Sequence, residues 1–471
     1  PNDHDVPMYW WSNIAVPEAD DVRVLAPGDA AWRFDETATV GGVELPVVDG
    51  RDVTYPAAAP GAADYFVRLD EGHPPWVAAV DGSGFGLVQS STPELRGRKL
   101  FVWGSSTGGR HWQEWLSPLG GRYLEIQAGL LRTQLEHVPM PARAEWAWVE
   151  TYGAVQADPD VVHGADWSSA RDEIERSLSS SVSAAWLATR REEAAWLAEQ
   201  PPADLLHTGS GWGALEVRHR GGGLVDRAAT PFPVASLGSE QAPWAVLLET
   251  GQLPGADPAL PPPSYVVSPS WADRLERSSG DDWHTWLQRG VAHHHAGRVE
   301  AAADAWRRSL AATPNAWALR NLAVVAADRG AAAELLRQAA ALAPEQSPLV
   351  AELLEALLDD GRSAEVLAAV DAARPEVAAD PLVRFLEARA AVATGEAERA
   401  EAVFASVTMP WVREGSRSLD DLWFRLETLR IARQRGVEVD DSLVAEVRST
   451  TKLPHAYDFR MSPGPPIETP P

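Results

Sequence analysis

Glycine and proline recur at a nearly constant interval in the C-terminal half of the chain, and this period constrains the fold more than any other feature. Successive glycines lie 33, 31 and 34 residues apart and successive prolines 30, 31 and 35, at Gly297, Gly330, Gly361 and Gly395 and at Pro314, Pro344, Pro375 and Pro410. A period of about 34 residues, with glycine inside the unit and proline at its end, is typical of stacked helix pairs. Each pair buries its apolar stripe only against its neighbours, so we expect about four pairs to form a curved solenoid over residues 279–450.

The first of these units resembles a known repeat. It matches the tetratricopeptide consensus at Trp283, Leu287, Gly290, Ala302, Trp306, Ala311 and Pro314. The later units match it less well, and we expect residues 422–447 to form a closing helical segment. The resemblance implies an all-α tetratricopeptide solenoid that docks a protein or peptide partner. Beyond it, the Pro-rich tail at 451–471 is expected to be disordered or to become ordered only on contact.

Residues 1–155 have the pattern of a β domain. Short apolar segments alternate with Gly, Pro and Asp turns, which is typical of a sandwich or barrel. The expected strands lie near residues 22–25, 65–69, 76–80, 85–90 and 99–103. No helical period interrupts them, so we expect no helix in this region.

A connector at 156–278 joins the two regions. Ile174, Leu178, Val182 and Trp186 recur at helical spacing and predict one helix over residues 167–199, ended by Pro201. A mixed, β-containing segment is expected at 205–271, with a glycine-rich loop at 209–213. The predicted fold class is therefore α+β multidomain, in the order β-sandwich, mixed connector, helical solenoid.

Composition excludes several classes of function. A net charge of -26, from 41 basic and 67 acidic residues, would repel phosphate backbones, so we expect no nucleic-acid partner. No apolar run is long enough to cross a bilayer, so we expect no membrane partner. There is no cysteine, which excludes disulfides and thiolate chemistry. Because the sequence starts at Pro1 and not at Met, we expect a fragment, and a cytoplasmic location with its leader left open.

The stretch at 122–150 holds the candidate chemistry. Tyr123, Glu125 and Gln127 alternate with apolar residues, so they are expected on one face of a strand. After Gly129 and a turn at 139–141, a third strand-like piece would place Trp146, Trp148 and Glu150 on a shared face. An acid, an amide and indole rings together are suited to a sugar pocket. The alternative is that Glu125 belongs to a structural ion pair.

This stretch also resembles a known family. Leu124-Glu125-Ile126-Gln127 is similar to the Leu-Glu-x-Gln motif of the aldose 1-epimerase (galactose mutarotase) superfamily, in which the Glu is the general base at the anomeric hydroxyl. The sequence YWWSNI at 9–14 resembles that family's His-x-Tyr-Phe-Asn-Leu strand, and 86–92 and 99–104 would form the strand pair leading to the base. The resemblance covers residues 6–150 and implies a β-supersandwich of which this chain holds the later part.

One position departs from that family. Aligning Asn13 with the family's Asn places Tyr9 where the epimerase has its catalytic His, and Tyr is a poor proton donor at neutral pH. The resemblance therefore implies a carbohydrate-facing site with the reaction left open.

Three functions are compatible with these residues. The first is a carbohydrate-active enzyme, such as a glycoside hydrolase or sugar epimerase, in which Glu125 is base or nucleophile, Tyr9 stands at the acid position, and Glu136 or Glu150 is the second carboxyl group. The second is a glycan-binding domain without catalysis. The third is a scaffold that works through its repeats. Candidate substrate-binding residues are Trp10, Asn13, Trp103, His111, Trp112, Gln127, Trp146, Trp148 and Glu150.

Two histidine-containing segments need separate treatment. His111 and Trp112 fall in an expected loop that either lines the sugar pocket or is anchored by buried indoles. The run at 293–295 consists of three consecutive histidines, whose side chains point about 100° apart on a helix and cannot converge on one ion. We therefore expect no metal and no cofactor.

Overall fold

The structure is a computed structural model that describes residues 4–34, 39–70, 72–117, 120–201, 203–221, 231–405 and 418–461. The chain forms two compact units. Unit 1 combines Pro1–Leu197 with two later segments, Val412–Phe424 and Ala445–Pro471. Unit 2 combines Ala198–Trp411 with Arg425–Val444. Each unit is described by itself.

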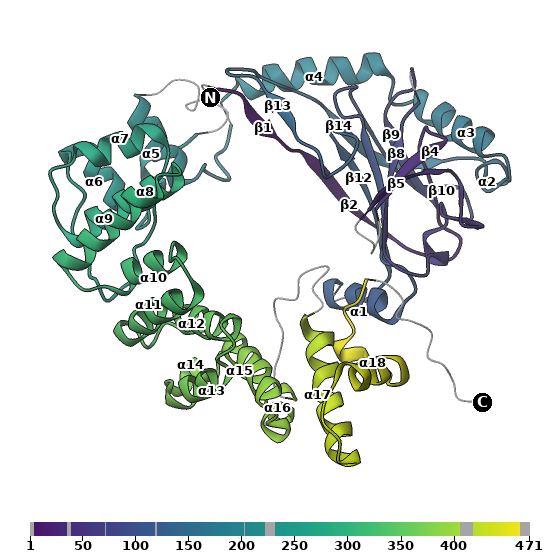
Figure 1. The fold of residues 1–471 in the computed structure, drawn as a ribbon. Helices are drawn as coiled ribbons and strands as arrows, with labels where there is room; N and C mark the ends of the chain where they lie inside the picture. The colour runs from purple at the N-terminus through teal and green to yellow at the C-terminus, as the bar shows by residue number, and fades with distance from the viewer. Residues whose placement is uncertain are drawn as a thin grey trace. The chain divides into compact units, whose positions relative to one another are not determined.

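Unit 1 is built on two antiparallel sheets (Figure 1). The six-stranded sheet has, in spatial order, β2 (Trp11–Pro17), β12 (Tyr123–Gly129), β11 (Gly97–Val102), β8 (Ala63–Arg68), β4 (Ala30–Phe34) and β5 (Val40–Glu44). The four-stranded sheet has β14 (Glu150–Gln156), β10 (Phe85–Ser91), β9 (Trp76–Val80) and β3 (Arg23–Leu25). Two short pairs are β1 (Val6–Met8) with β13 (Val138–Met140) and β6 (Val47–Val48) with β7 (Arg51–Asp52). The strands predicted from the sequence are confirmed.

The main core of unit 1 lies between the two sheets. Leu124 and Ile126 of β12 are 0% and 1% exposed and pack with Val77 and Ala79 of β9 in one apolar cluster. Successive strand residues point to opposite faces, so Glu125 must lie on the outer face of the six-stranded sheet. The predicted alternation in β12 is confirmed.

Helices cover the outer face of the four-stranded sheet. Trp167 and Ile174 of α3 (Trp167–Ser179) pack on Trp76 and Val80 of β9 in a second core, next to the short α2 (Pro159–Val162). The single helix predicted at 167–199 is instead two, because α4 (Ala184–Ala198) starts anew. Serine hydroxyls explain the break: Ser181 donates to a main-chain carbonyl, and Ser183 accepts from the Trp186 N–H as a helix cap.

A helix interrupts the β region, contrary to the prediction. Helix α1 (Thr107–Leu116) includes His111 and Trp112, which were expected in a loop. Its start at Gly108-Gly109 argues against a helix on propensity alone. The glycines are needed because a Cβ at Gly109 would lie 2.2 Å from the Trp103 carbonyl oxygen, and one at Gly108 would lie 2.0 Å from that of Arg460.

The predicted third strand piece at 142–150 does not form. Residues 141–149 make a turn followed by irregular chain, and β14 begins only at Glu150. Trp146 and Trp148 therefore do not share a strand face with Glu150. Pro141 and the positive φ of Arg143, 62°, account for the turn.

The segment at 205–271 was predicted to contain β structure, but its described residues form helices joined by irregular chain and no strand. It forms α5 (Gly211–Arg220), α6 (Ala242–Thr250) and α7 (Pro269–Arg277) around a core that includes Trp244 and Trp271. The glycines at 209–213 were interpreted as a loop, but Ser210 caps α5 and the Phe232 ring packs against Gly209 and Gly213. Close ring contact, rather than turn formation, explains these two glycines.

The predicted solenoid of helix pairs is confirmed in unit 2. The pairs are α8 (Trp283–His295) with α9 (Val299–Ala312), α10 (Ala316–Val324) with α11 (Arg329–Leu342), α12 (Ser347–Asp359) with α13 (Ser363–Ala372), and α15 (Pro381–Thr394) with α16 (Ala397–Phe404). The short α14 (Pro375–Ala378) also belongs to unit 2, whereas α17 (Ser418–Arg435) and α18 (Asp441–Thr450) are each divided between the two units.

Glycine occupies the turns of three of these pairs, as predicted. Gly297, Gly361 and Gly395 have φ of 73°, 73° and 78°. Gly330 lies instead in the first turn of α11, and Pro410 is outside the described residues. Within the described residues, no helix combines the length and apolar character that spanning a membrane requires.

Candidate functional site

Glu125 lies on the outer face of the six-stranded sheet with two of its predicted partners. The Asn13 Nδ2 donates to Glu125 Oε2 at 2.6 Å, and the Gln127 Nε2 donates to the same oxygen at 3.0 Å. Strand β2 brings Asn13 there because it pairs with β12 in a register that places Asn13 opposite Gln127. Among the described residues, Glu125 forms no ion pair with a basic side chain, so the ion-pair alternative is not what the structure contains. Its Oε1 atom remains available to a ligand.

A chain of hydrogen bonds fixes the orientation of these amides. Lys99 Nζ donates to Gln134 Oε1 at 2.7 Å, and Gln134 Nε2 donates to Gln127 Oε1 at 2.6 Å. An ammonium group can only donate, so each amide in turn must present its NH2 toward the next, and Gln127 presents its NH2 to Glu125. Lys99, on the neighbouring strand β11, therefore orients the donors around Glu125.

Lys99 is itself held by a buried ion pair. Its Nζ lies 2.6 Å from Asp64 Oδ1, and over the rings of Phe66 and Phe101 at 5.4 and 5.3 Å. Burial raises the pKa of Asp64, and the Lys99 ammonium partly offsets this. Asp64 of β8 and Glu125 of β12 both lie directly opposite Phe101 of β11, which runs between them. Their side chains therefore point to the same face of the sheet. Sequence reasoning missed Lys99 and Asp64, although alternation along β11 and β8 is the signal that marks them.

Trp11, rather than the predicted Trp10, lies on this face of the sheet. Trp11 pairs with Gly129 at the end of β12, where a Cβ would lie 2.3 Å from the indole ring. Its ring is 5.9 Å from that of Phe66 in an edge arrangement. Gly129, which was interpreted as a strand break, therefore makes room for the Trp11 ring at one end of the strand face that carries Glu125.

Glu150 belongs to a different cluster. It accepts hydrogen bonds from Ser12, from Tyr152 at 2.9 Å, from Gln89 at 3.3 Å, and from the Trp10 indole at 3.4 Å. Ser12 and Asn13 are successive strand residues, so their side chains point to opposite faces. Glu150 and Glu125 are thus on opposite sides of the sheet, and the two cannot flank one glycosidic bond.

Glu136, the other proposed partner acid, is also engaged elsewhere. Arg132 Nη2 donates to Glu136 Oε1 at 2.6 Å, and the Thr133 N–H donates to Oε2 at 3.2 Å. Tyr9 is 45% exposed, and its ring lies 5.6 Å from that of His137. Partial burial raises the pKa of Tyr9, which makes it a still weaker acid at neutral pH.

Of the remaining predicted aromatic residues, Trp103 packs on the Glu125 side of the sheet, with its ring 4.7 Å from that of Phe101 and 5.9 Å from that of Tyr123. Trp103 and Trp112 are 0% and 2% exposed, so neither offers a ring face to a sugar. Trp146 and Trp148 are half-buried in the irregular chain before β14, and the Trp148 ring lies 5.3 Å from that of Trp10.

Helix α1 binds the C-terminal segment of the chain. Trp112 Nε1 donates to the Phe459 carbonyl at 2.8 Å, and His111 Nδ1 donates to the Asp458 carbonyl at 3.0 Å. The Phe459 ring packs 4.2 Å from the His111 ring. Burial lowers the pKa of His111. Of the two interpretations of this stretch, the structure is closer to the anchor, although only one of its two indoles is buried, since Trp115 is 39% exposed.

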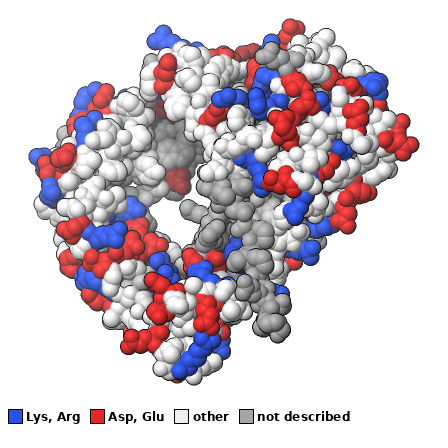
Figure 2. All heavy atoms as spheres, turned by 45° about the vertical axis from the view of Figure 1, so that its right-hand side comes forward, with Lys and Arg blue, Asp and Glu red and all other residues white. Residues whose placement is uncertain are grey.

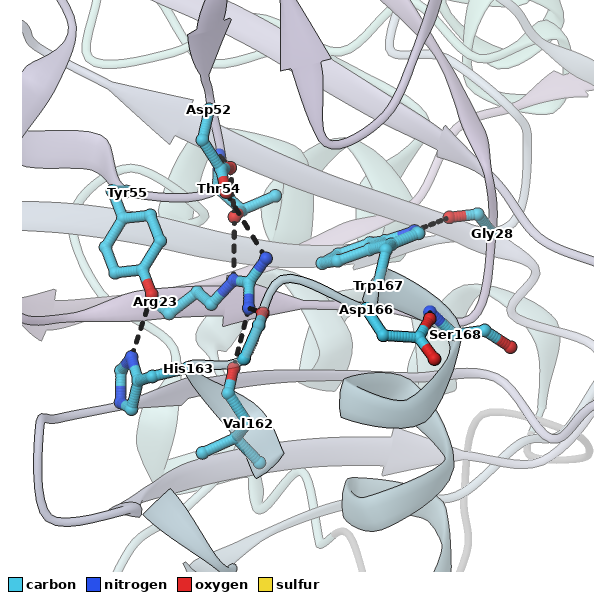
Figure 3. A network of polar contacts seen from close by, with 11 residues as sticks. Arg23, Gly28, Asp52, Thr54, Tyr55, Val162, His163, Asp166, Trp167 and Ser168 are labelled. Atoms are coloured by element: carbon cyan, nitrogen blue, oxygen red, sulfur yellow. Dashed lines mark hydrogen bonds and ion pairs between the residues drawn. The ribbon is translucent and has the colours of Figure 1, made fainter. Parts of the chain in front are cut away.

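A network around Arg23 fixes the helical layer to the sheets (Figure 3). Arg23, 2% exposed, donates to Thr54 Oγ1 at 3.1 Å and to the carbonyls of Val162 and Gly164 at 2.8 and 2.9 Å. The nearby Tyr55 hydroxyl lies 2.9 Å from His163 Nδ1. Every polar group in this network has an internal partner, so its role is to hold α2 and α3.

A cavity of about 110 Å³ lies beside the β6–β7 hairpin, with Arg33, Asp49, Arg51, Asp52 and Tyr65 in its wall. None of the residues predicted for a sugar site lines it. No group of three or more His, Asp or Glu within the described ranges is placed to hold a metal ion. On the face drawn in Figure 2, the described Lys and Arg side chains are interspersed with Asp and Glu and form no basic patch.

Known proteins resemble the chain mainly in fold. Residues 1–142 match the family model described as a domain of unknown function, DUF5107. A tetratricopeptide-domain protein from Parabacteroides distasonis is similar over 93% of this chain and 67% of its own, at 16% identity and a TM-score of 0.56. No curated protein has significant sequence similarity to the chain.

Two further solved structures are similar over smaller parts of the chain. The Pseudomonas aeruginosa pilF protein covers 38% of this chain and 79% of its own, at 18% identity and a TM-score of 0.29. A tetratricopeptide protein of Thermus thermophilus covers 34% and 90%, at 18% identity and a TM-score of 0.22. Their scores are too low to support an argument. The comparisons support an N-terminal β-sheet domain with a helical region of tetratricopeptide type, and none of them points to a mutarotase.

Proposed function

We propose that this chain is a docking protein whose helical repeats bind an extended segment of a partner protein. The observation that supports this proposal is the stack of helix pairs in unit 2, whose fold resembles that of a tetratricopeptide-domain protein. Such a stack presents the first helices of its pairs as one continuous surface.

Ion pairs between neighbouring repeats keep that surface rigid. Arg320 of α10 donates to both carboxylate oxygens of Glu352 in α12, at 2.9 and 2.9 Å. Arg399 of α16 binds Glu387 of α15 and Asp371 of α13, at 2.8 and 2.7 Å. A preorganised surface loses little conformational entropy on binding, which favours docking.

A photo-crosslinking amino acid placed at one of two exposed positions tests the docking surface. Val324 ends the first helix of its pair and is 57% exposed, whereas Leu342 ends the second helix of the same pair and is 47% exposed. We expect the full chain with the probe at Val324 to crosslink one stoichiometric partner, and the matched chain with the probe at Leu342 not to do so. Equal yields at both positions, or no crosslink at either, would refute the docking proposal.

A second candidate function concerns the Glu125 face of unit 1. We infer that it binds a carbohydrate, because a carboxylate oriented by two amide donors shares this face with the Trp11 ring. If the site is catalytic, Glu125 would be the base at an anomeric hydroxyl. The second carboxyl group would then be Asp64, which shares the face and has a raised pKa, rather than Glu136 or Glu150.

Binding of sugars to Glu125→Gln and Glu136→Gln chains tests this second function. Replacing Glu125 removes a charge-assisted acceptor and should weaken sugar binding by about tenfold or more, as followed by calorimetry. Glu136 lies outside the face, so its variant should bind as the unaltered chain does. Product release that is lost with Glu125→Gln would identify an enzyme, and binding without product would identify a glycan-binding domain. Sugar binding that is unaffected by Glu125→Gln would contradict this site.

A further inference from the structure

A proline-containing segment of unit 2 lies across the first helices of the first two repeats. Three side chains of these helices donate to its main-chain carbonyls. His284 Nδ1 donates to Pro254 at 3.0 Å, Trp283 Nε1 to Ala256 at 2.9 Å, and Trp317 Nε1 to Pro258 at 3.2 Å. Helix α8 supplies the first two donors and α10 the third.

The accepting carbonyls are spaced by two residues; the backbone from Pro254 to Asp257 is without a turn, and Pro258 begins the turn that Leu260 closes on Asp257. Carbonyls at alternate residues of extended backbone point to the same side. Burial follows the same period: Pro254, Ala256 and Pro258 are half-buried, whereas Gly255 and Asp257 are exposed. Proline has no N–H, so its carbonyl is the only main-chain group it offers for recognition. The helices therefore bind the backbone of the segment, and its prolines restrict that backbone to the conformation that presents these carbonyls.

The donors are buried and fixed in orientation. Trp283, His284 and Gln288 are 5%, 1% and 2% exposed. Gln288 Nε2 lies 3.3 Å from His284 Nε2, which accepts from it, so the ring proton is on Nδ1, facing Pro254. Burial lowers the pKa of His284, which keeps the ring neutral in this tautomer.

One polar atom of this face has no partner. The Oε1 of Gln288 is buried and accepts no hydrogen bond from any described residue. The Nε2 of the same side chain donates to the Ser264 carbonyl at 3.0 Å. Ser264 follows a turn at Asp257, whose carbonyl accepts from the Leu260 N–H at 3.1 Å. An unsatisfied buried acceptor is costly, and a main-chain N–H from a ligand would satisfy it.

We propose that Trp283, His284, Gln288 and Trp317, here called the carbonyl-reading face, form a binding site for an extended proline-containing peptide, which residues 254–258 occupy within the same chain. The proposal rests on the docking function above and names the kind of partner. Indole-lined surfaces are suited to proline-rich segments, because these are already extended and lose little entropy on binding. A partner segment of this kind replaces the internal one and uses the same three donors.

The internal segment sets the affinity that a partner must exceed. A ligand tethered in the same chain acts at an effective concentration in the millimolar range. A free peptide with the internal sequence therefore binds the unaltered chain weakly and binds a vacated face well. The unaltered and the vacated chain differ only in whether residues 254–258 fill the face, so the difference in their affinity for the free peptide measures this competition.

The test uses a fluorescent peptide with the sequence of residues 252–260, QLPGADPAL, and the full chain. In a vacated chain, residues 254–258 are replaced by glycine and serine at unchanged length. Fluorescence anisotropy should show at least about tenfold tighter peptide binding by the vacated chain than by the unaltered one. Adding Trp317→Phe, which removes one donor and keeps most of the ring, should weaken that binding by about fivefold.

The matched control is Trp286→Phe in the vacated chain. The Trp286 indole donates to Asp281 and lies between two arginines, away from the segment, so this substitution should leave peptide binding unchanged. Equal affinity of the vacated and unaltered chains, or equal effects of Trp317→Phe and Trp286→Phe, would overturn the proposal. If circular dichroism shows the vacated chain unfolded, Pro258→Gly loosens only the internal occupant and must still increase peptide binding. A partner that still crosslinks at Val324 while the peptide fails to bind would refute this proposal and leave the docking function standing.

Discussion

At the scale of single residues, the donors around Glu125 depend on one buried cation. Lys99 is 5% exposed and binds Asp64, while its hydrogen bond to Gln134 orients the amides up to Glu125. A buried charge that loses its partner remains desolvated without compensation. Lys99 is therefore expected to matter for stability as well as for the site.

The Lys99→Met variant should lower the free energy of unfolding by about 3–5 kcal/mol, because it leaves Asp64 buried and unpaired. Urea denaturation measures this change. Arg132→Met is the control, since its pair with Glu136 joins a 73% exposed guanidinium and should contribute less than about 1 kcal/mol. Similar losses in both variants would show that the Lys99–Asp64 pair is not a buried, stabilising contact.

A second residue-scale consequence concerns pH. Burial, followed by the neighbouring Asp421 charge, raises the pKa of Asp420 to about 6, and its side chain is 5% exposed. The folded state therefore binds this proton more tightly than the unfolded chain, whose pKa is near 3.8. The resulting stabilisation is fully present below pH 3.8 and is lost as pH rises through 6.

Asp420→Asn removes that dependence. The variant should be more stable than the unaltered chain at pH 7.5 by roughly 1–2 kcal/mol, a full shift being discounted for partial burial, and the advantage should shrink at about pH 5. Denaturation at both pH values measures it. An advantage that does not vary with pH would mean that Asp420 is not the titrating group.

At the scale of elements, α1 shows why local propensity failed. Gly108 and Gly109 argue against a helix in isolation, yet the backbone of Trp103 and of Arg460 approaches so closely that only glycine fits. Such contacts join distant parts of the chain and leave no local signal. The error at 205–271 has the same origin, because the glycines there accommodate the Phe232 ring.

Gly109→Ala should destabilise unit 1 by about 1–3 kcal/mol, because the new Cβ meets a backbone oxygen at 2.2 Å. Gly41→Ala in β5 is the matched control, since a Cβ there meets nothing within 4 Å, and it should change stability by no more than about 0.5 kcal/mol. Thermal unfolding followed by tryptophan fluorescence compares the two. Equal stability of both variants would show that α1 tolerates a side chain at this position.

At the scale of the whole molecule, what could be predicted from sequence depended on the range of the contacts. The helix pairs of unit 2 follow from a local period, and strands such as β9 follow from short apolar runs. The Glu125 face needed Asn13, which lies 112 residues away in sequence, and the register of β2 on β12 that brings them together. Glu150 was misplaced because alternation within one stretch does not reveal which sheet a later strand joins.

The contact between α1 and the C-terminal segment has a consequence for synthesis of the protein. The carbonyl that Trp112 binds belongs to a residue 347 positions later in the chain. At about 5–20 residues per second, a ribosome needs roughly 17–70 s to produce it. During that interval the nascent first unit exposes the aromatic surface that Phe459 will cover, and it can complete its packing only after Phe459 has been synthesised.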